Sequence, residues 1–90
     1  MPPDKSHLLH FYGRECVHCR QLEPLLERLE EELGVEVEHL EIWHNQANAA
    51  LYRQYDQGRC GGVPFLYNTR TNAWLCGNVA YEQLKKWALG

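Results

Sequence analysis

Two cysteines separated by two residues, Cys16 and Cys19, are the side chains of this sequence best suited to chemistry. They follow a short apolar stretch that ends at Gly13, and they open a segment with helical periodicity. At this spacing the two sulfurs lie about one helical turn apart, which is close enough for a disulfide. A helix N-terminus presents unpaired N–H groups and a positive dipole end, and both lower the pKa of a thiol. Cys16 is therefore the predicted nucleophile, and Cys19 is the predicted resolving thiol.

A Cys-x-x-Cys pair has other uses, and the spacing alone leaves them open. Such a pair can form a structural disulfide or supply half of a zinc site. His18 lies between the cysteines, where it can add a positive charge or a hydrogen bond near the sulfur; the alternative is a solvated loop residue. His7, His39 and His44 show no ligand spacing, so we expect no metal site.

The rest of the sequence predicts the elements that position this pair, in the order β-α-β-α-β-β-α. The expected strands are residues 6–12, 35–43, 63–67 and 73–76, and the expected helices are residues 17–33, 46–55 and 81–89. One face of the first helix carries a leucine stripe: Leu22, Leu25, Leu26, Leu29 and Leu33. Gly34 is placed to end that helix, and Asn45 to cap the second. We expect Trp43, Trp74 and Trp87 to be packing residues.

The first two strands are separated by a helix, so they are expected to be parallel, and the last two to form a hairpin. With this order the sequence resembles the thioredoxin superfamily. In that family a Cys-x-x-Cys motif follows the first core strand, and a proline stands five residues after the second cysteine, as Pro24 does here. The segment Gly62-Val63-Pro64-Phe65 matches the family's cis-proline segment, and Gly77 matches a glycine after the following strand. The resemblance covers residues 6–89.

This resemblance implies a thioredoxin-like α/β fold, with a mixed four-stranded sheet and helices on both faces. It implies a thiol–disulfide oxidoreductase in which a cis bond before Pro64 exposes backbone for a substrate strand. Val63, Pro64 and Gly77 are the expected substrate-binding residues. The expected partners are protein disulfides or dithiols, with glutathione or a reductase regenerating the pair and no organic cofactor. Two other functions stay open: a redox-inactive binding module, and a metal-binding protein that uses the cysteine pair.

Several positions depart from the family pattern. Glu15 stands where thioredoxins carry a tryptophan, and Val17-His18 stand where they usually carry Gly-Pro. His10 stands where they carry a buried aspartate, and we expect a core histidine with satisfied hydrogen bonds rather than a proton-transfer group. His18, directly before the second cysteine, and Val63, directly before the expected cis-proline, are similar to the residues at these positions in bacterial periplasmic disulfide-forming oxidases. By that analogy His18 stabilises the reduced form. The chain length is similar to that of glutaredoxins.

The remaining cysteines, Cys60 and Cys76, are expected near the same end of the molecule, since they flank Pro64 and Gly77. They are candidates for a second disulfide, an auxiliary redox pair or free buried thiols. Neither has a close cysteine neighbour in sequence, so free thiols are the favoured prediction.

Composition and charge limit the class of protein and the partners that this sequence can have. The 90 residues suffice for one domain, residues 1–90, and 44% of them are apolar, as in an ordinary globular protein. The formal net charge is −3 and no Lys/Arg run is present, so no nucleic-acid partner is expected. No apolar stretch approaches the ~20 residues that span a bilayer. Residues 1–6 lack the apolar core of a signal peptide. We expect a monomer in the cytoplasm or an organelle stroma.

Overall fold

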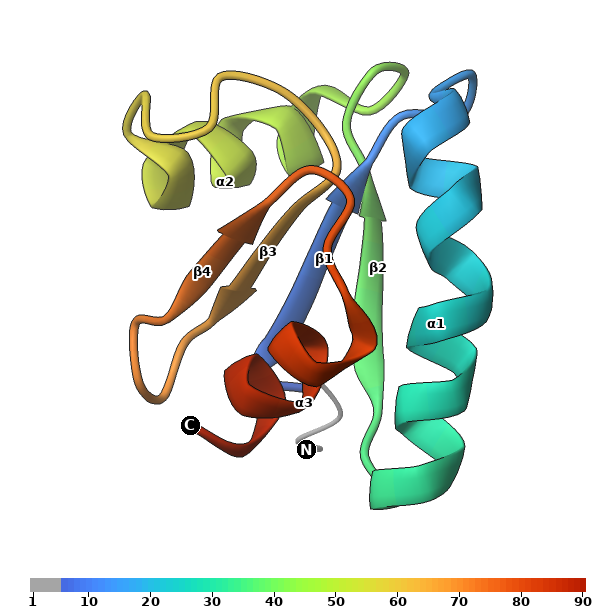
Figure 1. Cartoon of the computed structure of the whole chain (residues 1–90). Helices are drawn as coiled ribbons and strands as arrows, with labels where there is room; N and C mark the ends of the chain where they lie inside the picture. Colours follow the sequence, from blue (N-terminus) through green and yellow to red (C-terminus); the bar gives the residue numbers. More distant parts are fainter. Residues whose placement is uncertain (1–5) are drawn as a thin grey trace.

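The computed structural model describes residues 6–90 and contains, within them, four strands and three helices in the predicted order (Figure 1). These are β1 (Leu8–Tyr12), α1 (Val17–Leu33), β2 (Val37–Glu41), α2 (Gln46–Asp56), β3 (Phe65–Asn68), β4 (Trp74–Cys76) and α3 (Tyr81–Leu89). The helices match the predicted bounds within one residue, and the strands differ by at most two residues at either end. Residues 1–5, part of the segment searched for a signal peptide, lie outside the described residues.

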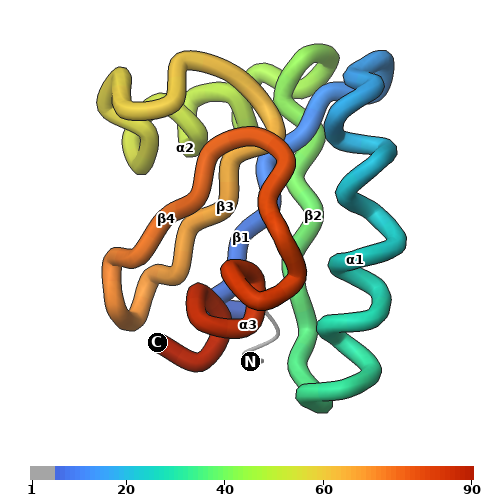
Figure 2. Tube along the Cα trace, in the orientation of Figure 1, coloured from blue at the N-terminus to red at the C-terminus, as the bar shows by residue number. Residues whose placement is uncertain are grey.

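The strands form one mixed sheet in the order β2-β1-β3-β4. β1 and β2 are parallel because α1 carries the chain back between them, and Leu8 pairs with Val37. β3 runs antiparallel to β1, and β4 pairs with β3 as a hairpin, as predicted. Figure 2 shows the consequence: the β1–α1 turn, the β2–α2 loop and the segment before β3 gather at one end of the sheet.

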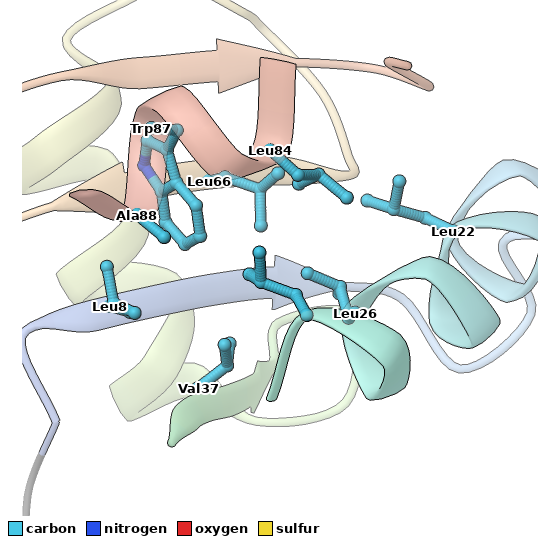
Figure 3. Close-up of a cluster of buried hydrophobic side chains, with 9 residues drawn as sticks. Leu8, Leu22, Leu26, Val37, Leu66, Leu84, Trp87 and Ala88 are labelled. Atoms are coloured by element: carbon cyan, nitrogen blue, oxygen red, sulfur yellow. The ribbon is translucent and has the colours of Figure 1, made fainter. Parts of the chain in front are cut away.

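Alternating side chains of the sheet build two cores, one on each face. Leu8 and Leu66 face α1 and α3, where they pack with the α1 leucines, Leu84 and Trp87 (Figure 3). Leu9 and Phe11 point the other way, toward the aromatic residues of α2. The two cores confirm a thioredoxin-like α/β fold with helices on both faces of the sheet.

The helix that follows the Cys-x-x-Cys motif is set by its ends and its apolar stripe. Cys16 is the N-cap residue, and Gly34 adopts the left-handed conformation that ends the helix. Leu22, Leu26 and Leu29 are fully buried, which anchors α1 to the sheet. Pro24 lies inside this helix, on its exposed side. Packing therefore fixes the N-terminus of α1, and with it Cys16, over the end of β1.

Candidate active site

Cys16 and Cys19 are joined by a disulfide, with their Cα atoms 5.2 Å apart. As the N-cap of α1, Cys16 accepts a hydrogen bond at Sγ from the backbone N–H of Cys19, at 3.1 Å. The N–H of Cys16 donates to Gly13 O at 3.0 Å, which closes the turn between β1 and α1. Cys16 is 6% exposed and Cys19 is 1% exposed. Cys16 is thus the more accessible residue of the two, and its sulfur lies where helix N–H groups stabilise negative charge.

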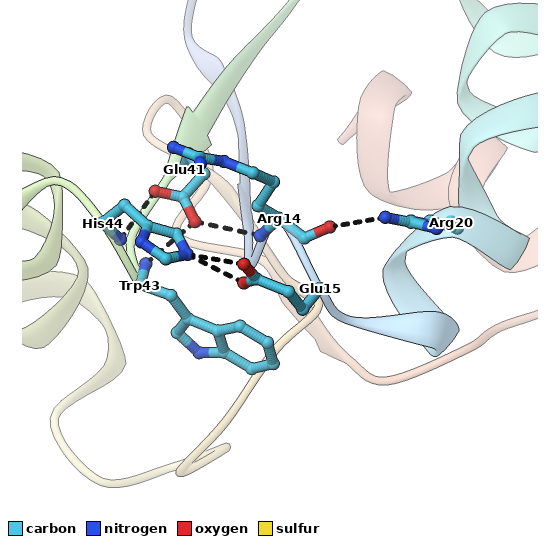
Figure 4. A network of polar contacts seen from close by, with 6 residues as sticks. All are labelled: Arg14, Glu15, Arg20, Glu41, Trp43 and His44. Carbon is cyan, nitrogen blue, oxygen red and sulfur yellow. Dashed lines mark hydrogen bonds and ion pairs between the residues drawn. The ribbon is translucent and has the colours of Figure 1, made fainter.

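A carboxylate behind the β1–α1 turn holds two loops together (Figure 4). Glu41, at the end of β2, accepts backbone N–H bonds from Arg14 (2.9 Å), Trp43 (3.2 Å) and His44 (2.8 Å). Partial desolvation raises the pKa of Glu41, but these three donors outweigh it and leave the pKa below its ordinary value. The turn beside Cys16 is therefore tied to the β2–α2 loop by charge-assisted hydrogen bonds.

Glu15, which replaces the family's tryptophan, makes a second link between the same two loops. His44 Nε2 lies 2.8 Å from Glu15 Oε1. The hydrogen bond from His44 is the main reason that the pKa of Glu15 lies below its ordinary value. Both side chains are largely exposed, so this pair orients the loops more than it stabilises the fold.

Trp43 occupies the surface next to this turn. Trp43 is 51% exposed and Trp74 is 39% exposed, so the expectation of a packing role is wrong for these two residues, although Trp87 is buried as expected. A Cβ atom at position 13 would fall 2.2 Å from the Trp43 ring, so only Gly13 permits this close approach. Gly13 O accepts the N–H of Cys16, so the Trp43 ring packs against the turn that leads into the cysteine pair. In the sequence, Trp43 follows β2, which is the parallel neighbour of β1. That position was the signal that placed Trp43 next to the β1–α1 turn.

The predicted substrate-binding residues come together on the other side of Cys16. Cys16 Sγ lies 3.9 Å from Val63 O, and the Val63–Pro64 peptide bond is cis. Gly77 donates its N–H to Pro64 O at 2.8 Å, which fixes the end of β4 against the same segment. Tyr52 supports it from α2 by donating its hydroxyl hydrogen to the carbonyl of residue 62, at 2.9 Å.

His18 is exposed, and its hydrogen bonds go to side chains rather than to a sulfur. Its Nδ1 lies 3.4 Å from Gln21 Oε1 and 3.3 Å from Asn78 Nδ2. Asn78 also donates to Gln21 at 2.8 Å. Sequence reasoning did not single out Asn78, whose position directly after Gly77 brings it over the start of α1.

His10 is buried under α1, with 1% of its surface exposed. Its Nδ1 lies 2.9 Å from His39 Nδ1, whereas Nε2 is buried without a partner among the described residues. Burial, assisted by the neighbouring His39, lowers the pKa of His10 to about 3, so the ring is neutral at physiological pH. The expected satisfied core histidine is therefore satisfied at one nitrogen only. A cavity of about 250 Å³ adjoins it, lined by His10, Tyr12, Glu23, Glu27, Glu30 and His39.

Cys60 and Cys76 also form a disulfide, with their Cα atoms 5.5 Å apart, so the favoured prediction of free thiols is wrong. The β3–β4 hairpin brings Cys76 opposite Phe65, at the start of β3. The loop before β3 returns Cys60 to the same place, because the Asp56 carboxylate accepts the N–H of Cys60 at 2.7 Å. Folding thus joins cysteines that are 16 residues apart in sequence.

Two further observations concern metal binding and membrane-spanning helices. Within residues 6–90, no group of three or more His, Cys, Asp or Glu side chains is arranged to hold a metal ion. The helices of that same part of the chain are all too short or too polar to cross a membrane.

Comparisons with known proteins agree with the geometry. The sequence matches the family described as Thioredoxin over residues 1–87. A similar solved structure is the glutaredoxin (grx-1) from Archaeoglobus fulgidus, with 19% identity, a TM-score of 0.69, and coverage of 94% of this chain and 88% of that one. At this identity the likeness shows the fold. No curated protein sequence matches this chain. A thioredoxin-like fold with a Cys-x-x-Cys pair at disulfide distance supports thiol redox function in general. Because the family match spans nearly the whole sequence, this chain belongs to the thioredoxin family.

Proposed function

We propose that this protein is a thiol–disulfide oxidoreductase that acts on protein disulfides through Cys16 and Cys19. The observation that carries the proposal is the position of Cys16 Sγ at the N-cap of α1, where it accepts the N–H of Cys19 at 3.1 Å. In the reduced protein the same N–H and the helix dipole stabilise a thiolate, which is the reactive form of cysteine.

The reaction is two successive thiol–disulfide exchanges. The Cys16 thiolate attacks one sulfur of the substrate disulfide, and the other substrate sulfur leaves as a thiolate. Cys19, deprotonated in turn, attacks Cys16 Sγ of the mixed disulfide, closes the Cys16–Cys19 bond and releases the second substrate thiolate. Two electrons pass from the protein to the substrate, and the released thiolates take up the two protons lost by the cysteines. In reverse, the oxidised pair accepts two electrons from a dithiol.

The surroundings of Cys16 favour a polypeptide as the substrate. The carbonyl of Val63 lies 3.9 Å from Cys16 Sγ, and the backbone there suits pairing with an extended segment. The hydrogen bond from the N–H of Gly77 to Pro64 O fixes this segment beside Cys16. On the opposite side, Val17 is 64% exposed and Trp43 is 51% exposed, which offers apolar contacts to a partner protein.

Regeneration requires a second thiol partner. We assign this role to glutathione or to a reductase, with no organic cofactor. His18 is proposed to tune the pair through its charge, because it is held at the start of α1 by Asn78.

Trapping the mixed disulfide tests the proposal. Reduced Cys19→Ser protein lacks the resolving thiol, so we expect it to remain covalently attached to an oxidised protein substrate, with the linkage at Cys16 identified by mass spectrometry. Cys16→Ser is the matched control and should form no adduct there. If Cys19→Ser forms no adduct, or if Cys16→Ser retains the turnover of the wild-type protein, the proposal is wrong and a redox-inactive binding module replaces it.

A further inference from the structure

The second disulfide lies on the far side of the peptide that Cys16 contacts. Cys16 Sγ is 3.9 Å from Val63 O, and Cys60 Sγ is 4.0 Å from the next carbonyl oxygen, that of Pro64. The N–H of Gly77, the residue directly after Cys76, donates to that same Pro64 oxygen. One short backbone segment therefore touches both sulfur pairs.

The two pairs differ in access. Cys16 and Cys19 are both buried, whereas Cys60 is half-buried and Cys76 is exposed. Cys76 is the last residue of β4, the edge strand of the sheet, so no further strand covers it. An incoming thiolate therefore reaches Cys76 more easily than Cys60, and exchange follows access.

The loop that carries Cys60 has anchors that do not depend on the disulfide. The Asp56 carboxylate, 3% exposed, accepts the N–H of Cys60 at 2.7 Å and that of Gly61 at 3.1 Å. Tyr52 donates to Gly62 O at 2.9 Å. These bonds hold the loop in place when the sulfurs part, so the pair can open without unfolding the chain.

A positively charged side chain, that of Arg59, lies near the segments that the Cys60–Cys76 disulfide joins. The Arg59 guanidinium lies 5.9 Å from the ring centroid of Trp74, so it reaches from the Cys60 loop across to β4. It thus lies near the two segments that the disulfide joins. Arg59 directly precedes Cys60 in the sequence, and positive charge in this region favours the thiolate form of cysteine, which is both the leaving group when the bond opens and the nucleophile when it closes.

We propose that Cys60–Cys76 is a second, thiol-exchangeable disulfide that dithiols open in the folded protein, and that its opening weakens the reaction of Cys16 with protein substrates. A dithiol attacks Cys76 Sγ through one thiolate, and Cys60 leaves as a thiolate. The second thiol of the reductant then displaces Cys76. The reductant becomes a cyclic disulfide, and the protein gains two electrons and two protons as two cysteine thiols.

The effect on Cys16 rests on the proposed function. Opening the bond removes the covalent link between the Cys60 loop and the end of β4. The Val63–Pro64 segment keeps its hydrogen bonds and its core packing but loses the covalent tie to β4, and a segment held less tightly positions a substrate strand poorly. A small disulfide, which does not pair with this segment, is unaffected.

The first arm of the test uses Cys16→Ser/Cys19→Ser protein, in which only the second pair can exchange. The protein is equilibrated in dithiothreitol buffers of graded redox ratio, quenched with acid and alkylated, and its mass and circular dichroism are measured. We expect two thiols to become alkylated reversibly while the folded spectrum is kept. If the pair opens only together with loss of that spectrum, the disulfide is purely structural and the proposal is overturned.

The second arm compares wild-type protein with Cys60→Ala/Cys76→Ala. We expect kcat/KM for a protein disulfide to fall about tenfold in the variant, and kcat/KM for bis(2-hydroxyethyl) disulfide to stay unchanged. Equal values for the protein substrate would overturn the link to Cys16. If the wild-type protein reduces neither substrate, the proposed function fails, while the first arm still decides whether the second pair exchanges. The first arm keeps native Cys60 and Cys76, so it stands even if the alanine variant does not fold.

Discussion

The two disulfides of this protein lie in different surroundings. Cys16 and Cys19 are buried at the N-terminus of α1, where a backbone N–H points at the sulfur of Cys16. Cys60–Cys76 joins a loop to an edge strand, is more exposed, and has the Asp56 carboxylate rather than a helix N-terminus beside its backbone. The comparison separates two properties that control the reactivity of a cysteine. For the first pair it is the stabilisation of the thiolate charge, and for the second it is the access of an attacking thiolate to the sulfur.

The largest expected effect is the pH dependence of stability that is caused by His10, in the strand that leads to the first cysteine pair. The pKa of His10 falls from 6.5 to about 3 on folding, so the unfolded chain binds the proton that the native ring refuses. The stabilisation is complete above the unfolded pKa and is lost as the pH falls toward 3, at up to about 1.4 kcal/mol per pH unit. Urea unfolding between about pH 4.5 and about pH 6.5 should show this slope, since the carboxylates discussed above titrate lower.

The control for this prediction is His10→Leu, which removes the titrating group but keeps an apolar side chain under α1. The comparison uses the slope of unfolding free energy against pH, because the substitution also changes packing. Equal slopes in the variant and the wild-type protein would contradict a neutral, buried His10.

On the side of the second pair, the loop anchor should have the next largest effect. Asp56→Ala removes the charged acceptor of two part-buried backbone N–H groups, those of Cys60 and Gly61, and should cost about 1 to 3 kcal/mol of stability. Asp56→Asn retains one acceptor oxygen and should lose less. Denaturant unfolding of both variants measures the difference, and identical stabilities would show that the disulfide alone holds the loop.

Each pair has an exposed tryptophan near it, which permits a matched substitution. Trp43 is 51% exposed beside Gly13, in the turn that leads to Cys16, and Trp74 is 39% exposed in the strand that ends at Cys76. We expect Trp43→Ala to lower kcat/KM for a protein disulfide about tenfold, equivalent to about 1.4 kcal/mol, and Trp74→Ala to lower it less. Neither change should alter turnover of a small disulfide. A larger loss from Trp74→Ala would reverse the assignment of the docking side.

The smallest expected effect is on the reduction potential of the first pair. His18→Ala removes the proposed charge near the sulfurs and should make the pair more reducing by on the order of 15 mV, equivalent to about 0.7 kcal/mol for two electrons. Asn78→Ala is the matched control, since it removes a hydrogen-bond partner of His18 and leaves the imidazole in place. An unchanged potential in His18→Ala would leave His18 as a solvated surface residue.

Local patterns in the sequence were sufficient for most of the fold. The bounds of α1 were predicted at Val17–Leu33 because a leucine stripe marks its buried face and Gly34 marks its end. The gathering of Cys16, Val63 and Gly77 was implied by the order of elements and the family resemblance, and the structure brings them together.

What the sequence did not predict depends on register between distant segments. The contact between His10 and His39 arises from the parallel pairing of β1 with β2, which no local pattern encodes. The Cys60–Cys76 bond likewise depends on the hairpin register that sets Cys76 opposite Phe65.

The most direct test of the proposed function is the reduction potential of the Cys16–Cys19 pair. The protein is equilibrated in glutathione buffers, quenched by alkylation and mapped by peptide mass, so that this pair is distinguished from Cys60–Cys76. We expect reversible, two-electron opening of the Cys16–Cys19 bond between about −270 mV and about −120 mV, the range spanned by thioredoxin-fold oxidoreductases. If no Cys16–Cys19 disulfide forms at any glutathione ratio, the protein is not an oxidoreductase at this site.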